Sequence, residues 1–410
     1  MKILYISQYF PPEIAAPAVR VSELSRHWAA AGHDVTVLTG FPNHPTGVVH
    51  PNNRSKLRHF VFRERMEGVK VVRTWLWPRP NRKAIGRILS FVSFSVSAAI
   101  SGLFLSCPDA VIATSPQLLV GLTGWWLARA KRVPFVFEVR DLWPESLSAV
   151  GMGNDQSMLH GVLAKVAGFL YRQSDKIVVV TPAFKDHLIK KWKVPAEKIA
   201  VVTNGVETEL FSPDKASTSL RQELGVEGKF IACYIGTMGM AHGLETLLEA
   251  ASELKTTVPQ VFFLLVGDGA EKEHIVARAH SLGLSNLRIV DSQPREKIPS
   301  YICASDVCLV LLKRTPVFET VIPTKMLEFM SCARPVILGV EGQARKIIEE
   351  AKAGVCIQPE NAKELTQAIM RLNADAALRK SIGSHGRQFI LKQFSRGQTA
   401  ATYLNILRKI

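Results

Sequence analysis

Polar side chains follow an apolar run in the first half of the chain, where a strand over residues 135–139 is expected to end. Residues 140–145 read Arg-Asp-Leu-Trp-Pro-Glu. Arg140 can pair with a phosphate group, and Asp141 can orient or deprotonate a hydroxyl group. The structural alternative is an Asp that caps the next turn and an Arg that pairs with it. The cluster predicts Arg140 and Asp141 as catalytic residues.

A turn that contains two glycines is the first candidate for binding an anionic donor. The expected strand over 230–235 leads into residues 236–239, Gly-Thr-Met-Gly, and a helix is expected to begin near Gly243. Backbone N–H groups at such a turn, and at the start of a helix, bind phosphate. We therefore predict that Gly239 and Gly243 bind the donor and that His242 donates to a phosphate oxygen. A surface histidine is the alternative.

A second candidate is the segment that follows Pro323. Thr324 is expected to cap a helix, and Lys325 then falls in the first helical turn, where the helix dipole disfavours a positive charge. A bound anion would offset that, so Thr324 and Lys325 are predicted to bind the donor, with Lys325 also catalytic. Glu328 lies one turn further on and is predicted to accept hydrogen bonds from a ribose diol. A contact within a capping box is the alternative for Glu328.

The loop after the first expected strand, residues 2–6, adds a weaker signal. Ala15 and Ala16 are small enough to let a ligand approach the backbone there. Several nucleotide-binding and hydrolase motifs are missing from the sequence. It contains no GxxxxGK[ST], no GxGxxG after the first strand and no GxSxG, which argues against a P-loop ATPase, an NAD enzyme and an α/β-hydrolase.

Length and composition fit a folded protein of more than one domain. The chain has 410 residues, of which 47 % are hydrophobic and 21 % are charged. Its six cysteines are scattered without metal-ligand or disulfide spacing, so we expect buried thiols in a reducing compartment and no bound metal.

Strands and helices alternate along the whole chain, which is typical of parallel sheets. The strands are expected at 2–6, 35–39, 110–113, 135–139 and 176–180, and again at 230–235, 262–266, 287–290, 307–311 and 335–338. The expected fold class is α/β, with two doubly wound Rossmann-like domains and a ligand cleft between them. The domains are predicted at 1–204 and 205–385, and a last helix, within 386–410, can pack back on the N-terminal domain.

Positive charge is concentrated ahead of an uncharged segment. The net charge is +16, and residues 54–87 hold eleven Lys or Arg against two Glu. Residues 88–107 carry no charge and are long enough to span a bilayer, but they are rich in serine and lie inside a domain. We favour a helix lying on an anionic membrane surface, and the alternative is a core helix beside a solvated loop. The basic residues expected to meet lipid headgroups are Arg79, Arg82, Lys83 and Arg87.

The start of the chain does not resemble a secretory signal. The first apolar run is short, and Pro11 and Pro12 interrupt it. Together with the basic and apolar segments, this predicts a cytoplasmic protein attached peripherally to the inner face of a bacterial cell membrane.

Four segments in this order resemble retaining glycosyltransferases of the GT-B type, glycosyltransferase family 4, over nearly the whole chain. They are Gly32-His33-Asp34-Val35-Thr36-Val37, Asn204-Gly205-Val206-Glu207 with Phe211 and Pro213, Val266-Gly267-Asp268-Gly269, and residues 328–337 from Glu328 to Ile337. The resemblance implies transfer of a sugar from a sugar nucleotide, with retention of configuration and without a metal.

Within that family the chain is similar to bacterial surface-polysaccharide transferases, through its versions of the segments at 140–145 and 323–325. It most resembles the L-fucosamine transferases of O-antigen assembly. That likeness implies a UDP-sugar donor, carrying N-acetyl-L-fucosamine or a similar deoxy amino sugar. It also implies a glycan on a polyprenyl diphosphate as the acceptor. Separately, we expect no nucleic acid as a partner.

The sequence departs from the family pattern at several functional positions. Ala15 and Ala16 stand where the family has a glycine pair, and Arg140 stands where it usually has His. Thr237 and His242 occupy the places of its phosphate-binding Arg and Lys. We therefore expect the diphosphate charge to be met by Lys325 and Arg140. Of the family's two glutamates, Glu328 remains, because Thr320 fills the first position and Glu319 lies one residue away from it.

Two other functions have to be weighed against transfer. A sugar-nucleotide epimerase can use the same fold, but its chemistry needs several acidic groups and His around the sugar, which the expected lining lacks. A non-enzymatic nucleic-acid-binding protein would fit the charge of +16, yet the sequence has no RNP-like strand, zinc finger or arginine-rich tail.

Overall fold

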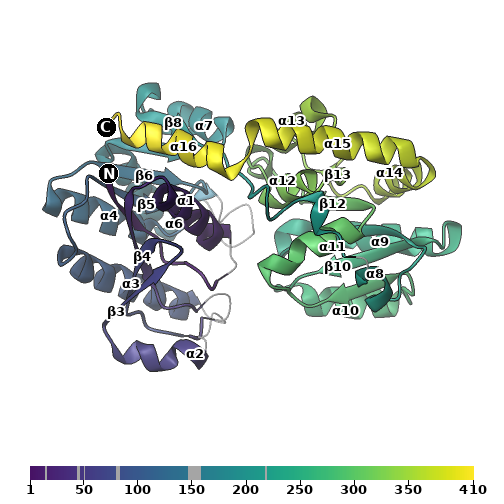
Figure 1. Ribbon diagram of the computed structural model, residues 1–410, viewed down its shortest axis with the longest axis horizontal. Helices are drawn as coiled ribbons and strands as arrows, with labels where there is room; N and C mark the ends of the chain where they lie inside the picture. Colours follow the sequence, from purple (N-terminus) through teal and green to yellow (C-terminus); the bar gives the residue numbers. More distant parts are fainter. Residues whose placement is uncertain (14–15, 44–46, 50, 80–83, 146–157, 218) are drawn as a thin grey trace. The chain divides into compact units, whose positions relative to one another are not determined.

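The computed structural model describes residues 1–410 apart from 14–15, 44–46, 50, 80–83, 146–157 and 218. The chain forms two compact units (Figure 1). Unit 1 contains Met1–Asn204 and Arg396–Ile410, and unit 2 contains Gly205–Ser395. Residues 386–395, predicted to separate from the second domain, lie in unit 2 because a single helix, α15 (Ala376–Gln393), runs through most of them.

Unit 1 contains one eight-stranded sheet. Its strands are β1 (Lys2–Ile6), β2 (Asp34–Gly40), β3 (Val61–Met66), β4 (Val69–Thr74), β5 (Ala110–Thr114), β6 (Phe135–Val139), β7 (Lys176–Val179) and β8 (Ile199–Val201). They lie in the order β3-β4-β2-β1-β5-β6-β7-β8, and only the edge pair β3–β4 is antiparallel. Strands β5 and β6 are buried along their whole length, as their continuous apolar sequences predict.

Helices cover both faces of this sheet. They are α1 (Ala16–Ala30), α2 (Pro51–Arg54), α3 (Ala84–Leu103), α4 (Leu118–Lys131), α6 (Met158–Gln173), α7 (Pro182–Trp192) and α16 (Arg396–Leu407). Because side chains alternate along a strand, Ile112 faces the core under α1 and α16, whereas its neighbour Ala113 faces α4. Figure 1 shows the last helix, α16, beside α1.

Aromatic packing holds the returning helix α16 to unit 1. Trp28 of α1 stacks on Tyr5 at 5.7 Å between ring centroids and meets Tyr403 of α16 edge-on at 5.3 Å. The Trp28 indole N–H also donates to the carbonyl of Ala400 at 3.0 Å. The chain therefore completes the first unit with its last twelve-residue helix.

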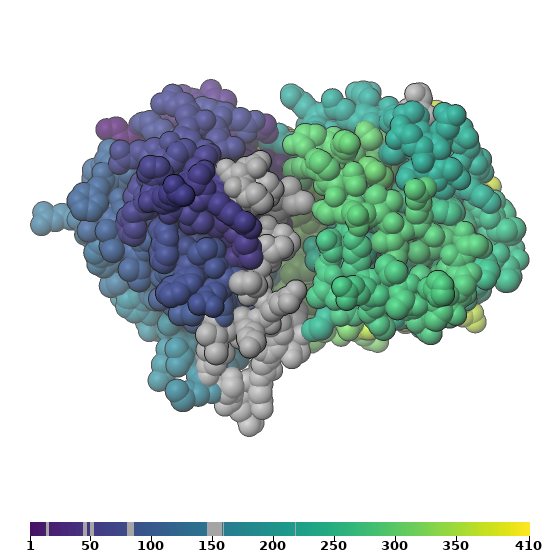
Figure 2. All heavy atoms as spheres, turned by 90° about the horizontal axis from the view of Figure 1, so that it is seen from below, coloured from purple at the N-terminus to yellow at the C-terminus, as the bar shows by residue number. Residues whose placement is uncertain are grey.

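Unit 2 contains a six-stranded, fully parallel sheet. Its strands are β9 (Phe230–Ile235), β10 (Val261–Val266), β11 (Leu287–Val290), β12 (Val307–Leu311), β13 (Val336–Gly339) and β14 (Gly354–Cys356). Its other helices are α8 (Leu220–Glu223), α9 (Glu245–Thr257), α10 (Lys272–Ser281), α11 (Ile298–Ala304), α12 (Thr324–Ser331), α13 (Gln343–Ala351) and α14 (Ala362–Ala374). The strand order β11-β10-β9-β12-β13-β14 is that of a Rossmann-like domain. An apolar core fills each face of the sheet. Figure 2 shows the heavy atoms of unit 1 in purple to teal and those of unit 2 in teal to green.

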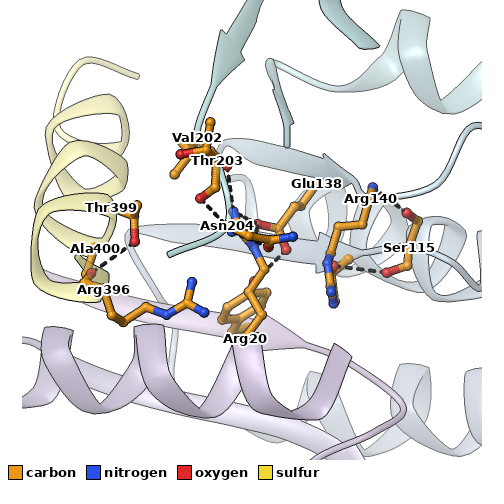
Figure 3. Close-up of polar contacts among 12 residues, drawn as sticks. Arg20, Ser115, Glu138, Arg140, Val202, Thr203, Asn204, Arg396, Thr399 and Ala400 are labelled. Atoms are coloured by element: carbon orange, nitrogen blue, oxygen red, sulfur yellow. Dashed lines mark hydrogen bonds and ion pairs between the residues drawn. The ribbon is translucent and has the colours of Figure 1, made fainter. Parts of the chain in front are cut away.

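A buried arginine ties the end of the first Rossmann-like domain to its sheet (Figure 3). Arg20 of α1 donates to the Glu138 carboxylate of β6 and to the carbonyls of Val202 and Thr203, each at 3.0 Å. Tyr5 donates to the second Glu138 oxygen at 2.6 Å. Burial opposes ionisation of Glu138, but the positive charges of Arg20 and its neighbours hold the Glu138 pKa below its usual value.

Replacing Arg20 by Met should leave the Glu138 carboxylate buried without its cation, at a cost of about 3–5 kcal/mol in the free energy of unfolding. Urea unfolding followed by tryptophan fluorescence measures this directly, because all seven tryptophans belong to unit 1. Arg26→Met on the same helix is the control, since its ion pair with Glu67 is exposed and should contribute at most about 1 kcal/mol. Equal losses in the two variants would contradict this account.

Candidate active site

Two glycine turns lock together where strands β9 and β10 of unit 2 end. The backbone N–H of Gly236 donates to the carbonyl of Val266, and that of Met238 donates to Asp268. A Cβ on Gly267 would lie 1.9 Å from the Gly236 carbonyl oxygen, and Gly267 has a φ of +153°. Only glycine can therefore occupy position 267, and the turn of residues 236–239 rests directly on backbone.

The helix after this turn begins later than predicted. A 3-10 turn covers Met240–His242, Gly243 adopts a left-handed φ of 55°, and α9 starts at Glu245. The predicted helix start at Gly243 is wrong by two residues, because a left-handed residue cannot lie within a right-handed helix. Gly239 immediately precedes the 3-10 turn, and Gly243 ends it.

Lys325 places its ammonium group beside the first glycine turn. The Nζ atom lies 4.0 Å from the centre of the Tyr234 ring, and a Cβ on Gly236 would be 3.2 Å from it. Although the side chain is only half-buried, Nζ itself is enclosed and has no hydrogen-bond partner among the described residues. Burial lowers the Lys325 pKa to about 7.

Thr324 does not cap α12 as predicted. Pro323 occupies the N-cap position in an extended conformation, no side chain caps the helix, and Thr324 is its first helical residue. The prediction was wrong because the sequence pattern alone does not show whether Pro323 or Thr324 is the N-cap residue. Lys325 remains in the first turn, as expected.

His242 shares the same aromatic neighbour. Its ring lies 5.9 Å from that of Tyr234, and it makes a hydrogen bond to the backbone of Leu311 at the end of β12. The Nδ1 atom is enclosed and has no hydrogen-bond partner in the described part of the chain. Burial, followed by the charge of Lys325, lowers the His242 pKa to about 3, so the ring is neutral.

Glu328 pairs with an arginine that the sequence analysis did not single out. Arg295 donates from Nη1 to Glu328 Oε1 at 3.0 Å, and its guanidinium lies over the ring of Phe211. This ion pair links residues 33 positions apart, so no local pattern announces it. Binding of a ribose diol by Glu328 stays a prediction.

These side chains gather at the topological switch point of unit 2. Strands β10 and β11 lie on one side of β9, and β12 to β14 lie on the other. The turn after β9 carries Gly239 and His242, and a hydrogen bond from Lys313 to Ala241 joins it to the segment after β12. In open α/β sheets, ligands bind at this edge of the sheet and at this point.

A second polar cluster lies in unit 1 where β6 ends. The Ser115 hydroxyl, after β5, accepts from the backbone N–H groups of Arg140 at 2.7 Å and Asp141 at 3.3 Å, the first of which is visible in Figure 3. The Nε and Nη1 atoms of Arg140 are enclosed without a partner, and no ion pair joins its side chain to Asp141 among the described residues. Burial raises the Asp141 pKa and lowers that of Arg140.

Glu145 fixes the far end of this segment to α7. Its carboxylate accepts from Lys191 at 2.6 Å and contacts His187 at 3.0 Å. Burial opposes ionisation, yet these two contacts lower the Glu145 pKa to about 2. The segment that carries Arg140 and Asp141 is thus held at both ends, by Ser115 and by α7.

Residues 16–205 match the sequence family described as "Glycosyl transferase 4-like domain", and residues 217–389 match "Glycosyl transferases group 1". The chain is a glycosyltransferase. The predicted family is confirmed, and the epimerase alternative gives way to transfer.

Relatives and solved structures agree with the assignment of the chain as a glycosyltransferase. The chain is 24 % identical over 421 residues to WcaI of Escherichia coli K12, which is named as a colanic acid biosynthesis glycosyl transferase, and 100 % of both chains is covered. Sucrose-phosphate synthase from Thermosynechococcus elongatus matches with a TM-score of 0.79 and 20 % identity, over 100 % of this chain and 98 % of that one. Anabaena HepE in complex with UDP-glucose matches with a TM-score of 0.75 and 18 % identity, over 100 % of both chains. The predicted GT-B fold, with two Rossmann-like domains, is confirmed.

Helix α3 of the glycosyltransferase has one face bound to unit 1 and one exposed apolar face. The Ser97 hydroxyl donates to the carbonyl of Trp75, the Ser93 hydroxyl accepts from the Trp77 N–H at 2.9 Å, and Phe94 is fully buried. The exposed apolar residues recur at helical spacing and are Ile88, Leu89, Val92, Val96, Ile100, Leu103 and the adjoining Phe104. By length and composition α3 could cross a membrane, and 33 % of the window Gly86–Leu103 is buried in the protein. Ser93 and Ser97 therefore join α3 by hydrogen bonds to the segment at 75–77 of unit 1.

The remaining predicted residues differ in what can be said of them. Arg79 is exposed, with its guanidinium 5.5 Å from the Trp77 ring, and Arg87 is half-buried. Ala16 is exposed and is the first residue of α1. Ala15, Arg82 and Lys83 lie outside the described residues.

The contact between the two glycine turns predicts a large effect of Gly267→Ala on the stability of unit 2. The control is Gly225→Ala, at a left-handed φ of +62° with open space around it, which should cost roughly 1–2 kcal/mol for backbone strain. At Gly267 the new methyl group would overlap a carbonyl oxygen as well, which should cost at least about 1–3 kcal/mol more. Far-UV circular dichroism during urea unfolding measures both, and indistinguishable variants would refute the contact.

Proposed function

We propose that this glycosyltransferase moves a sugar from a UDP-sugar to a glycan carried on a polyprenyl diphosphate, in O-antigen or capsule assembly. The sugar we propose is N-acetyl-L-fucosamine or a similar deoxy amino sugar. The likeness to surface-polysaccharide transferases supports this, and the name of WcaI points to the same kind of product. The likeness in fold to HepE, solved with UDP-glucose, supports UDP as the carrier.

The observation that carries the proposal is the position of Lys325 Nζ, which is enclosed beside two glycine turns and has no hydrogen-bond partner among the residues that the structure describes. A buried polar group without a partner is costly, and a diphosphate would supply the missing acceptor. In our proposal Lys325, Thr324, Gly239, His242 and Gly243 surround the donor diphosphate. Glu328, held by Arg295, accepts from the ribose.

The proposed transfer retains the configuration of the sugar and needs no metal. The acceptor hydroxyl attacks the anomeric carbon from the face that the diphosphate leaves. The bond between that carbon and the phosphate oxygen breaks, the new glycosidic bond forms, and the departing phosphate takes the hydroxyl proton. Lys325 stabilises the charge that grows on the leaving group. In unit 1, Asp141 positions the acceptor, and Arg140 offers two unpartnered N–H groups to an anionic group.

A thermal-shift panel of nucleotides in the presence of EDTA tests the donor. A ligand that binds only the folded chain stabilises it, by about 2.7 kcal/mol at one hundred times its dissociation constant. UDP and UDP-sugars should raise the melting temperature, whereas GDP, ADP and NAD should leave it unchanged. A shift with GDP- or ADP-sugars alone would overturn the donor assignment. A requirement for added metal would overturn the metal-free mechanism, and no shift with any nucleotide would overturn the donor site.

We further propose that the glycosyltransferase is cytoplasmic and binds the inner face of the bacterial membrane through the exposed face of α3. That face presents Val92, Val96 and Ile100 to solvent, and basic residues precede it in the sequence. Apolar side chains on a surface helix enter the interface of a bilayer, while Arg79 and Arg87 attract acidic headgroups. This would hold the enzyme next to an acceptor that is anchored by its lipid.

Replacing Val96 by Glu should reduce binding to vesicles of phosphatidylcholine and phosphatidylglycerol by at least about tenfold, because a charge cannot enter the apolar layer. Co-sedimentation measures the bound fraction. Val276→Glu is the matched control, since Val276 is 46 % exposed on α10 of unit 2. Vesicle binding by Val96→Glu at the level of the unchanged chain would rule out the α3 face.

A further inference from the structure

The charge that this structure offers to a donor diphosphate is titratable. Arg and Lys are the usual partners of phosphate, and Arg stays charged at every accessible pH. In the described part of the donor site, Arg295 already pairs with Glu328. The enclosed nitrogens that lack a partner beside the glycine turns belong to Lys325 and His242.

Near neutral pH, the surroundings of Lys325 leave its ammonium form and its neutral amine form about equally populated. Burial disfavours the charge, and the first groups to offset this are Glu328 on the same helix and Cys233 on β9. The Tyr234 ring faces Nζ, but its hydroxyl donates to the Thr237 carbonyl, and burial raises its pKa far above neutrality. The net result is a Lys325 pKa of about 7.

The protonation of His242 decides what its enclosed nitrogen can do. Nδ1 has no hydrogen-bond partner among the described residues, and the Leu311 backbone favours the protonated form of the ring. In a neutral imidazole ring one nitrogen donates and the other accepts, whereas both nitrogens donate in the protonated ring. A phosphate oxygen is an acceptor, so donation from His242 to it requires a proton on Nδ1.

We propose that the donor diphosphate binds this site together with a proton, which Lys325 takes up from solvent. The inference rests on the proposed function, because it assigns the diphosphate to this site. The neutral amine of Lys325 can still donate from its N–H groups, but only the ammonium form also supplies a positive charge to the oxygen anion. A negative charge within about 4–6 Å raises the pKa of a basic group by about 1–3 units. The empty site therefore lacks charge that the filled site contains.

Titration calorimetry of the full chain with UDP tests this. At pH 8 the phosphates of UDP are already ionised, whereas Lys325, with a pKa of about 7, is about nine-tenths neutral. The binding enthalpy is measured in several buffers and should rise linearly with the ionisation enthalpy of the buffer. The slope equals the number of protons taken up per UDP bound, and it should be about 0.4–0.9. At pH 6.0 Lys325 is already mostly charged, so the number of protons that it takes up on binding should fall to about one-tenth.

Two variants identify the residue that takes up the proton. Lys325→Arg carries a permanent charge, so it should bind UDP at pH 8 with a slope below about 0.2. His242→Gln cannot be protonated, and it should retain most of the slope because Lys325 is the group that takes up the proton.

A slope of zero for the unchanged chain, with UDP bound, overturns the inference and leaves the proposed function intact. The same slope in the unchanged chain and in both variants also overturns it, because the proton then binds elsewhere. A chain that does not bind UDP at all overturns the proposed function.

Discussion

Enclosing a charged nitrogen without a hydrogen-bond partner costs a folded protein free energy, and Lys325 imposes that cost in unit 2. The fold around Lys325 fixes the position of its neighbours. The backbones of the two glycine turns touch, and this contact fixes the floor of the site. Nζ lies 4.0 Å from the centre of the Tyr234 ring, and the Tyr234 hydroxyl donates to the carbonyl of Thr237 in the turn. No side chain in the described part of unit 2 forms a hydrogen bond with Nζ.

Unit 1 shows the contrast between a satisfied and an unsatisfied buried arginine. Every donor group of Arg20 that the structure describes is used to hold Glu138 and the segment at 202–204. Arg140, two residues beyond Glu138, has its backbone N–H bound by Ser115 but leaves Nε and Nη1 open. The arrangement of Arg20 stabilises the domain, because removal of one partner would leave a buried charge uncompensated. The second is typical of a group kept for a ligand.

Much of the fold could be predicted from the sequence, because buried parallel strands are short apolar runs between turn residues, as at 135–139 and 230–235. The hairpin of β3 and β4 escaped prediction because Arg63, Arg65 and Lys70 interrupt its apolar pattern at an exposed edge. At the site, sequence position pointed to Lys325 and Arg140 as candidates. It could not reveal the Arg295–Glu328 pair or which nitrogen of His242 is free, since both depend on residues distant in the sequence.

A crystal structure of the chain with UDP tests the central claim most directly. If Lys325 is the group that the donor diphosphate completes, phosphate oxygens will lie within about 3 Å of Nζ, and the diphosphate will rest on the turn at residues 236–239. A complex in which UDP is ordered elsewhere, with Lys325 still enclosed and unpartnered, would contradict the account and give the buried ammonium a purely structural role.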